Sequence, residues 1–214
     1  MRAFLAGLTL AALLPSGQTA PAAPDVARQL QAHYAEVHDF TADFTQTYRG
    51  GVVSQTVTDR GTVRIKKPGR MRWEYATSQK QRVVADGTEI YFYLPEDRKV
   101  YVTPLPRADE ASKAMLFLTG RGDLTRDFTA SLAADQPAGQ WRLQLVPKVP
   151  DSDFTTLTLV VNRATLALEG LVTKDQTEGT TTYVFSNLKE NVGLKDGDFL
   201  FDTSKLPKDV EVIR

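Results

Sequence analysis

Residues 83–94 read VVADGTEIYFYL, two apolar runs joined by the pair Asp86-Gly87. An Asp-Gly pair between apolar runs is typical of a tight β-hairpin, because the central positions of its turn need a positive φ. The run 90–94 is apolar or aromatic at every position, so both faces of this strand present large apolar side chains. In an antiparallel sheet one face normally meets water, so the stretch predicts a hairpin whose second face also needs a cover.

Further strands are predicted on both sides of this hairpin. From Phe40 to Tyr48 large side chains alternate with Thr and Asp, which is the period of a half-buried strand. Gly50-Gly51 then predicts a turn. Later strands are expected at residues 57–65, 70–75, 99–103, 128–133, 140–147, 154–161, 166–175 and 180–188. Strand starts spaced by roughly ten to fourteen residues, with turn residues between them, predict one continuous antiparallel meander.

Two segments follow helical spacing. Apolar side chains recur every three or four residues from Val26 to Val37, which predicts an amphipathic helix. A second, short helix is expected from Asp109 to Thr119, with Gly120 at its C-cap. Its C-terminal end is apolar on nearly all sides, so this helix must be buried against another element.

The first 22 residues are predicted to be a secretory signal peptide. Met1-Arg2 gives a positive start, Ala3 to Leu14 is apolar, and Ala20-Pro21-Ala22 offers a cleavage site. The apolar run is too short for a ~30 Å hydrocarbon layer, and a buried N-terminal helix fits less well because the run lacks a polar face. We expect cleavage after Ala22 and one soluble domain over residues 23–214, since no later stretch approaches ~18 uninterrupted apolar residues.

The composition argues against several kinds of site. The chain has 26 basic and 26 acidic side chains, two histidines and no cysteine. Balanced charge argues against a nucleic-acid partner. Without cysteine there is no disulfide, thiolate metal site or cysteine nucleophile, and two histidines are too few for a multi-histidine metal centre. We therefore expect neither a metal nor a cofactor.

The sequence also gives little support for catalysis. It contains no G-x-S-x-G elbow, P-loop or H-E-x-x-H motif. His33 and His38 are interpreted as surface histidines and Asp86 as a turn residue, so no catalytic residue is expected. The excess of large apolar side chains on strands indicates instead a sheet curved around an interior. The pattern alone leaves open whether that interior is a cavity or a solid core around Trp73 and Phe92.

Several blocks, in chain order, carry a family resemblance. They are FTADFTQ at 40–46, Gly61, KKPGRMRWEY at 66–75, VVADG at 83–87, YFYLP at 91–95, DFLF at 198–201 and LPKDVEV at 206–212. Of these, the Lys-Pro-Gly block followed by the Asp-Gly hairpin is the most specific. On these residues the chain resembles the LolA family, periplasmic carriers of outer-membrane lipoproteins. The lack of a cysteine separates it from the related LolB receptor, which is anchored through a lipid.

The resemblance implies a mainly β fold, in which a single curved antiparallel sheet of about eleven strands forms an unclosed barrel. Helices would form a lid over a hydrophobic cavity. It further implies a monomeric, non-enzymatic periplasmic carrier. Its cargo would be triacylated lipoproteins, received from an inner-membrane ABC transporter and passed to a LolB-like receptor of the outer membrane where one exists.

Strand alternation and helix spacing give the residues expected to line this cavity. They are Leu30 and Tyr34 from the first helix, Phe40, Phe44, Met71, Trp73, Ile90 and Phe92 from strands, and Met115, Leu116 and Leu118 from the short helix. In the family, a basic residue before the proline of the Lys-Pro-Gly block holds the lid closed. That residue is arginine in familiar members and Lys67 here. Because lysine lacks the planar fork of arginine, the resemblance implies a weaker or differently arranged latch.

Three alternatives remain at this point. The first is a lipid- or glycolipid-binding module of the same architecture that does not serve lipoproteins. The second is a signalling domain that senses mislocalised lipoproteins, although such proteins usually carry a second domain. The third is an enzyme acting on lipids, which would need a nucleophile and a base facing each other in the cavity.

Overall fold

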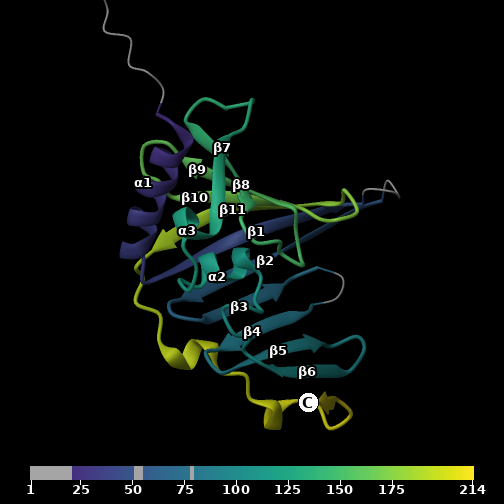
Figure 1. Ribbon diagram of the computed structural model, residues 1–214. Coiled ribbons are helices and arrows are strands. Elements are labelled where there is room, and N and C mark those ends of the chain that lie inside the picture. The colour runs from purple at the N-terminus through teal and green to yellow at the C-terminus, as the bar shows by residue number, and fades with distance from the viewer. Residues whose placement is uncertain (1–20, 51–54, 78–79) are drawn as a thin grey trace, which may run out of the picture.

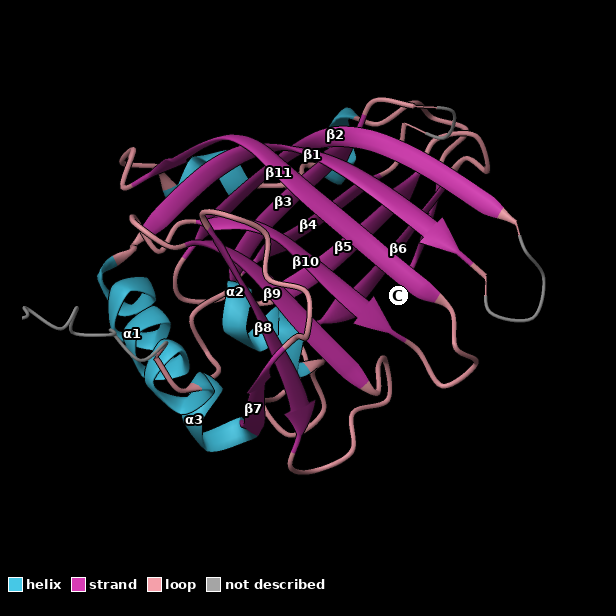
Figure 2. Ribbon diagram, turned by 90° about the horizontal axis from the view of Figure 1, so that it is seen from above, coloured by secondary structure: helices cyan, strands magenta, loops and turns pink. Residues whose placement is uncertain are grey.

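The computed structural model describes residues 21–50, 55–77 and 80–214. One long sheet curves around a group of short helices, which lie on its concave side (Figures 1 and 2). In chain order the elements are α1 (Ala23–Glu36), β1 (Asp39–Arg49), β2 (Thr56–Lys66), β3 (Arg70–Tyr75), β4 (Arg82–Asp86), β5 (Glu89–Leu94), β6 (Lys99–Pro104), α2 (Lys113–Leu118), α3 (Leu124–Asp127), β7 (Phe128–Leu132), β8 (Gln140–Pro147), β9 (Thr156–Asn162), β10 (Leu168–Lys174), β11 (Thr180–Glu190), two 3-10 helices (Asp196–Phe199 and Thr203–Lys205) and β12 (Glu211–Ile213).

The strand order is β12-β6-β5-β4-β3-β2-β1-β11-β10-β9-β8-β7. This confirms the predicted fold class, a mainly β protein built on a single curved sheet. The prediction of one continuous meander is wrong, because β6 and β7 lie near opposite edges of the sheet. Two meanders, β1–β6 and β7–β11, are instead joined by the antiparallel pairing of β1 with β11. The connection from β6 to β7 crosses the concave side and carries α2 and α3 (Figure 2).

Two details of the predicted elements need correction. Over the described residues the sheet has twelve strands, one more than the approximate number expected, because the three residues of β12 pair in parallel with β6. The helix expected over 109–119 begins only at Lys113, whose backbone N–H donates to Asp151 Oδ2 at 2.8 Å. Gly120 ends this helix as expected, with a φ of +71°. Of the predicted Gly50-Gly51 turn, Gly51 lies outside the described residues.

The main core lies between the concave face and the helices. Phe40, Phe44, Val63 and Ile65 are at most 2% exposed, as the alternation in β1 and β2 predicts. Gly61 stands opposite Phe44, and the Phe44 ring takes the place a side chain would fill, since a Cβ on Gly61 would lie 2.8 Å from it. Among the described residues, no helix has the length and apolar composition needed to cross a membrane.

A second, smaller core covers the convex face of β4–β6. Here the C-terminal segment packs on buried Val84, Val100 and their neighbours, and the Phe201 ring stacks on Tyr91 with 5.2 Å between ring centroids. The start of this segment is held by the buried Asp39 carboxylate, which accepts hydrogen bonds from the backbone N–H groups of residues 192–194. These bonds replace the water that the charge loses on burial.

Candidate functional site: an apolar cavity under α2

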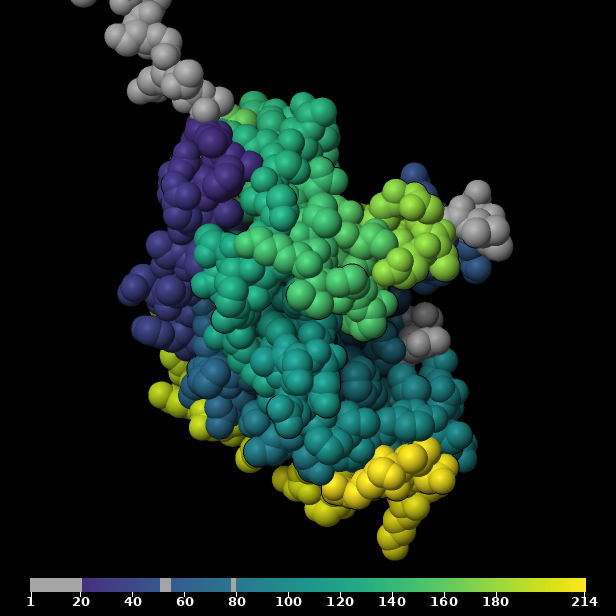
Figure 3. Space-filling view, in the orientation of Figure 1, coloured from purple at the N-terminus to yellow at the C-terminus, as the bar shows by residue number. Residues whose placement is uncertain are grey.

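A cavity of about 740 Å³ lies between the concave face and the segment that carries α2. In the space-filling view, the surface is hollowed where the light green part (β9–β11) faces the blue and teal part (β3–β6) (Figure 3). The volume is in the range of small-molecule pockets, roughly 300–1,000 Å³. Its apolar lining consists of Met71, Trp73, Val83, Ile90, Phe92, Pro104, Pro106, Ala111, Ala114, Met115, Leu118, Phe154 and Leu171.

Six of the eleven residues expected to line a cavity are brought together around it. They are Met71, Trp73, Ile90, Phe92, Met115 and Leu118. The Trp73 ring packs edge-on against Phe44 and Tyr183, with centroids 5.0 and 5.4 Å apart. Phe92 is 40% exposed. A large aromatic side chain left open inside a curved sheet provides an apolar contact surface for a ligand.

The other five residues do not line this cavity. Leu30, Tyr34, Phe40, Phe44 and Leu116 are at most 4% exposed and belong to the core between the helices and the sheet. Tyr34, for example, stacks on Phe117 with 4.5 Å between ring centroids. Contact between these five and an acyl chain remains a prediction, and it requires α1 or α2 to move.

Several lining residues were not predicted. Two of them, Tyr75 and Val83, could have been predicted from the strand pattern. Tyr75 lies on the same face of its strand as Met71 and Trp73, and Val83 pairs directly with Trp73 across the neighbouring strand. Leu171 and Tyr183 reach the cavity only through the pairing of β1 with β11. That long-range pairing has no signal in the local sequence pattern.

The lining is not wholly apolar. Polar side chains meet it at Gln46, Tyr75, Thr103, Glu110, Ser112, Asp153, Thr173, Thr181 and Tyr183. Tyr75 Oη donates a hydrogen bond to Gln46 Oε1 at 2.8 Å. Burial raises the pKa of both tyrosines above the ordinary value, with Tyr183 adding to the shift of Tyr75. Both hydroxyls therefore stay neutral and able to donate hydrogen bonds at physiological pH.

The expected latch residue, Lys67, lies where α1, α2 and the β2–β3 turn meet. Its ammonium donates a hydrogen bond to the Tyr34 carbonyl in the last turn of α1, and Nζ lies 3.4 Å from the centre of the Tyr34 ring. Free carbonyls at a helix C-terminus favour such a cation. The Lys67 stem also lies against Gly120, where an added Cβ would come within 2.5 Å of its Cδ atom.

Tyr34 in turn contacts α2, the helix expected to form part of the lid. Its hydroxyl donates to the carbonyl of Leu118, the last residue of α2, at 2.8 Å. Burial lowers the pKa of Lys67 to about 8, and the carboxylate of Glu190 opposes that shift. The site therefore disfavours the ammonium relative to water, because burial outweighs the favourable contacts that the ammonium makes. The geometry is that of a clasp, whereas its action as a latch remains a prediction.

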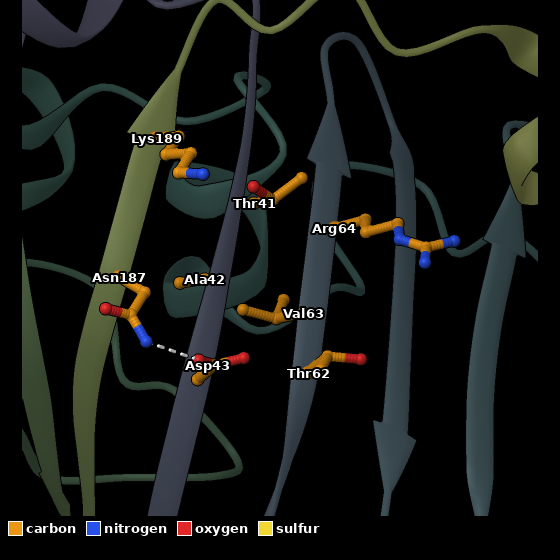
Figure 4. A pocket seen from close by; sticks show the side chains of 8 residues that line it. All are labelled: Thr41, Ala42, Asp43, Thr62, Val63, Arg64, Asn187 and Lys189. Atoms are coloured by element: carbon orange, nitrogen blue, oxygen red, sulfur yellow. Dashed lines mark hydrogen bonds between the residues drawn. The ribbon is translucent and has the colours of Figure 1, made fainter.

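A second hollow, of about 480 Å³, lies on the convex face between β11, β1 and β2 (Figure 4). It forms beside an irregularity in β1, where the register with β11 shifts between Thr41 and Asp43. Asn187 Nδ2 donates to Asp43 Oδ2 at 2.7 Å, and Arg64 and Lys189 also border the hollow. Its lining is therefore about half polar and includes charged side chains, so the hollow is less suited to an apolar ligand than the cavity under α2.

The fold and the cavity define a protein with an unclosed, mainly antiparallel barrel and a helical lid over an apolar interior. Within that class, a profile of the family described as "Outer membrane lipoprotein carrier protein LolA" matches residues 35–202. The chain therefore belongs to the LolA family, a family of carrier proteins. This confirms the resemblance found in the sequence.

Individual relatives cover the whole chain. An outer-membrane lipoprotein carrier protein of Chromohalobacter salexigens is 31% identical over 215 residues, covering 100% of this chain and 99% of the relative. One of Bordetella avium is 30% identical over 210 residues, covering 98% and 96%. Among solved structures, an uncharacterized conserved protein of Thermus thermophilus shares the fold, with a TM-score of 0.52, 15% identity and coverage of 88% and 98%.

Proposed function

We propose that this chain is a periplasmic carrier that shields the acyl chains of lipoproteins between the inner and the outer membrane. An inner-membrane ABC transporter would supply the triacylated cargo, and a LolB-like receptor, where present, would accept it. Residues 1–22 would be removed as a signal peptide, leaving a monomeric carrier. The observation that carries the proposal is the lidded apolar cavity of about 740 Å³ in a chain of this family.

The hydrophobic effect supplies enough free energy for this task. Each acyl methylene removed from water contributes about 0.8 kcal/mol, so shielding even one acyl chain outweighs any single contact in the protein. Apolar walls with a methionine at the lid, Met115, suit chains that carry few directional groups. Such a cavity distinguishes acyl chains from polar ligands but does not distinguish one lipoprotein from another.

Release requires that the empty, closed state compete with the loaded one. In the closed state, Lys67 and Tyr34 join α1 and α2, and five apolar side chains are sealed in the core between helices and sheet. Cargo would open the lid and take the place of these contacts. Only a difference in affinity between open and closed states shifts such an equilibrium, so the latch contacts set how readily cargo leaves.

Depletion of the protein in cells tests the proposal. If it is the carrier, lipoproteins destined for the outer membrane accumulate at the inner membrane when the protein is withdrawn. Correct sorting in depleted cells would contradict the proposal and favour a lipid- or glycolipid-binding module of the same architecture.

A further inference from the structure

The cavity is chemically asymmetric along the strands. Under α2 most walls are apolar, with Met71, Ile90 and Leu118 among them, although Glu110 and Ser112 border the cavity just before the helix. Apart from Thr103 on β6, the polar side chains of the sheet gather toward the opposite ends of the strands. Tyr75 is the last residue of β3, and Thr173 and Thr181 pair with each other beside the β10–β11 hairpin. In Figure 1 these strand ends lie on the side of the molecule away from α1.

Strand register places five of these side chains on one continuous patch, which we call the polar rim: Gln46, Tyr75, Thr173, Thr181 and Tyr183. Gln46 pairs with Tyr183 across β1 and β11. Thr181 and Thr173 follow two residues further toward the hairpin, about 6.6 Å along the strands. All five border the cavity, so a molecule whose chains lie under α2 has its other end at this rim.

The polar rim offers hydrogen-bond donors rather than charges. Both tyrosine hydroxyls stay protonated, because burial raises their pKa values, and the Tyr75 proton is donated to Gln46 Oε1, which orients the Gln46 amide. The Gln46 amide nitrogen supplies two more N–H groups, and within the described part of the chain neither it nor the hydroxyls of Thr173 and Thr181 have a protein hydrogen-bond partner. These side chains are half-buried, so a purely hydrocarbon ligand lying over them would take the donors out of water without giving them a hydrogen-bond partner, which is unfavourable.

We propose that the polar rim binds the ester carbonyl groups by which acyl chains are attached to the cargo's glyceryl group. This inference rests on the proposed carrier function, and it adds the position of the ester groups of the lipid anchor within the cavity. Ester carbonyls only accept hydrogen bonds, which matches a surface that presents donors. The acyl chains then extend under α2, and the polypeptide leaves at the strand ends away from α1.

The test compares two synthetic lipopeptides with the same peptide and chain length, one with ester-linked and one with ether-linked chains. An ether lacks the carbonyl but keeps the hydrocarbon. We expect the mature protein to bind the ester form about three- to tenfold more tightly, the effect of one or two net hydrogen bonds. Gln46→Leu and Thr181→Val each remove a rim donor that has no partner among the described residues, and they should bring that ratio close to one by weakening the ester form. Tyr93→Phe, in the separate core on the convex face, serves as the control.

The outcomes separate this inference from the proposed function. Equal affinity of the wild-type protein for both lipopeptides, or an ester preference that persists in both variants, overturns the inference alone. Failure to bind either lipopeptide overturns the carrier function as well. Diester and diether phosphatidylglycerol vesicles form a second pair, and an ester preference seen only with them would assign the rim to a phospholipid and overturn the proposal. Melting temperatures verify that each variant is folded.

Discussion

Lys67 joins three parts of the molecule through one side chain. It leaves the β2–β3 turn, donates to the last turn of α1, and lies against the glycine that ends α2. A hydrogen bond to a charged group contributes about 1.5–3 kcal/mol. Removing it therefore weakens the closed state by enough to change the lid equilibrium about tenfold or more.

Lys67→Leu is expected to slow release of a bound lipopeptide to acceptor vesicles by about tenfold, with capture changed much less. The reason is that the closed state, which competes with cargo, loses the hydrogen bond from Lys67 to the Tyr34 carbonyl while the cavity walls stay intact. Lys67→Arg keeps the charge and is the matched control. Equal effects on capture and release would show that Lys67 is not a latch.

The same side chain makes lid closure depend on pH. Burial lowers the Lys67 pKa from 10.5 to about 8 in the closed state, so between these values the open state binds more protons. The closed state therefore gains stability as pH rises from about 8 to 10.5, and the neutral amine still donates to the Tyr34 carbonyl. Glu190 and Tyr34 face the same amine, and Tyr34 does not titrate in this window because burial raises its pKa well above the ordinary value.

Uptake of a fluorescent apolar probe, measured at intervals from pH 7 to 10, reports this dependence. We expect uptake by the wild-type protein to fall with rising pH, and the trend to be absent in Lys67→Leu. A wild-type profile that rises with pH would show that the lysine is not desolvated in the closed state.

The lid helix α2 has only six residues, too few to be stable in isolation. It is held from outside at both ends, by Asp151 at its first N–H and by Tyr34 at its last carbonyl. Tyr34→Phe keeps the stacking on Phe117 and removes the second of these bonds. We expect a loss of about 1 kcal/mol in the closed state and faster amide exchange over 113–118. Tyr93→Phe is the control, and unchanged exchange in Tyr34→Phe would refute this support.

The inner surface of α2 provides a direct test of the cavity. Met115→Glu places a carboxylate among apolar walls, and burying it against acyl chains is unfavourable by several kcal/mol. Capture of the ester lipopeptide should fall at least a hundredfold with little change in melting temperature. Val184→Glu adds the same charge on β11 at a side chain that is 55% exposed and should leave capture unchanged. Normal capture by Met115→Glu would place the cargo elsewhere.

Most strands could be predicted because their signals are local. Period-two alternation identifies β1, the Asp86-Gly87 pair between two apolar runs identifies β4 and β5, and β8 spans Gln140–Pro147 as expected. The ends of α2 could not both be predicted, because its start depends on Asp151, distant in sequence. β12 was missed for the same reason, since its three residues form a strand only by pairing with β6.

The lining of the cavity could be predicted only in part from the alternation of side chains along the strands. Strand alternation predicts that Phe44 and Phe92 are both on the inner face. It does not predict that Phe44 is buried beneath the helices while Phe92 is 40% exposed. That difference arises from the whole molecule, in which the β1–β11 pairing brings the two meanders together and the β6–β7 connection covers only part of the space between them. The latch position came from the family resemblance, and its contact with Tyr34 came only from the structure.

The whole molecule combines an apolar cavity under a short helix, α2, with the polar rim at the opposite strand ends. Its 26 basic and 26 acidic side chains balance, which suits a carrier that has to leave two membrane surfaces without electrostatic retention. The central claim is that the cavity holds the lipid anchor of a lipoprotein.

Native mass spectrometry of the protein isolated from the periplasm of its own cells tests this claim most directly. We predict a species with the mass of one chain beginning at Ala23 plus one lipidated polypeptide, from which activation releases the intact lipoprotein. A preparation whose bound molecules are phospholipids or glycolipids, with no lipidated polypeptide among them, would contradict the account.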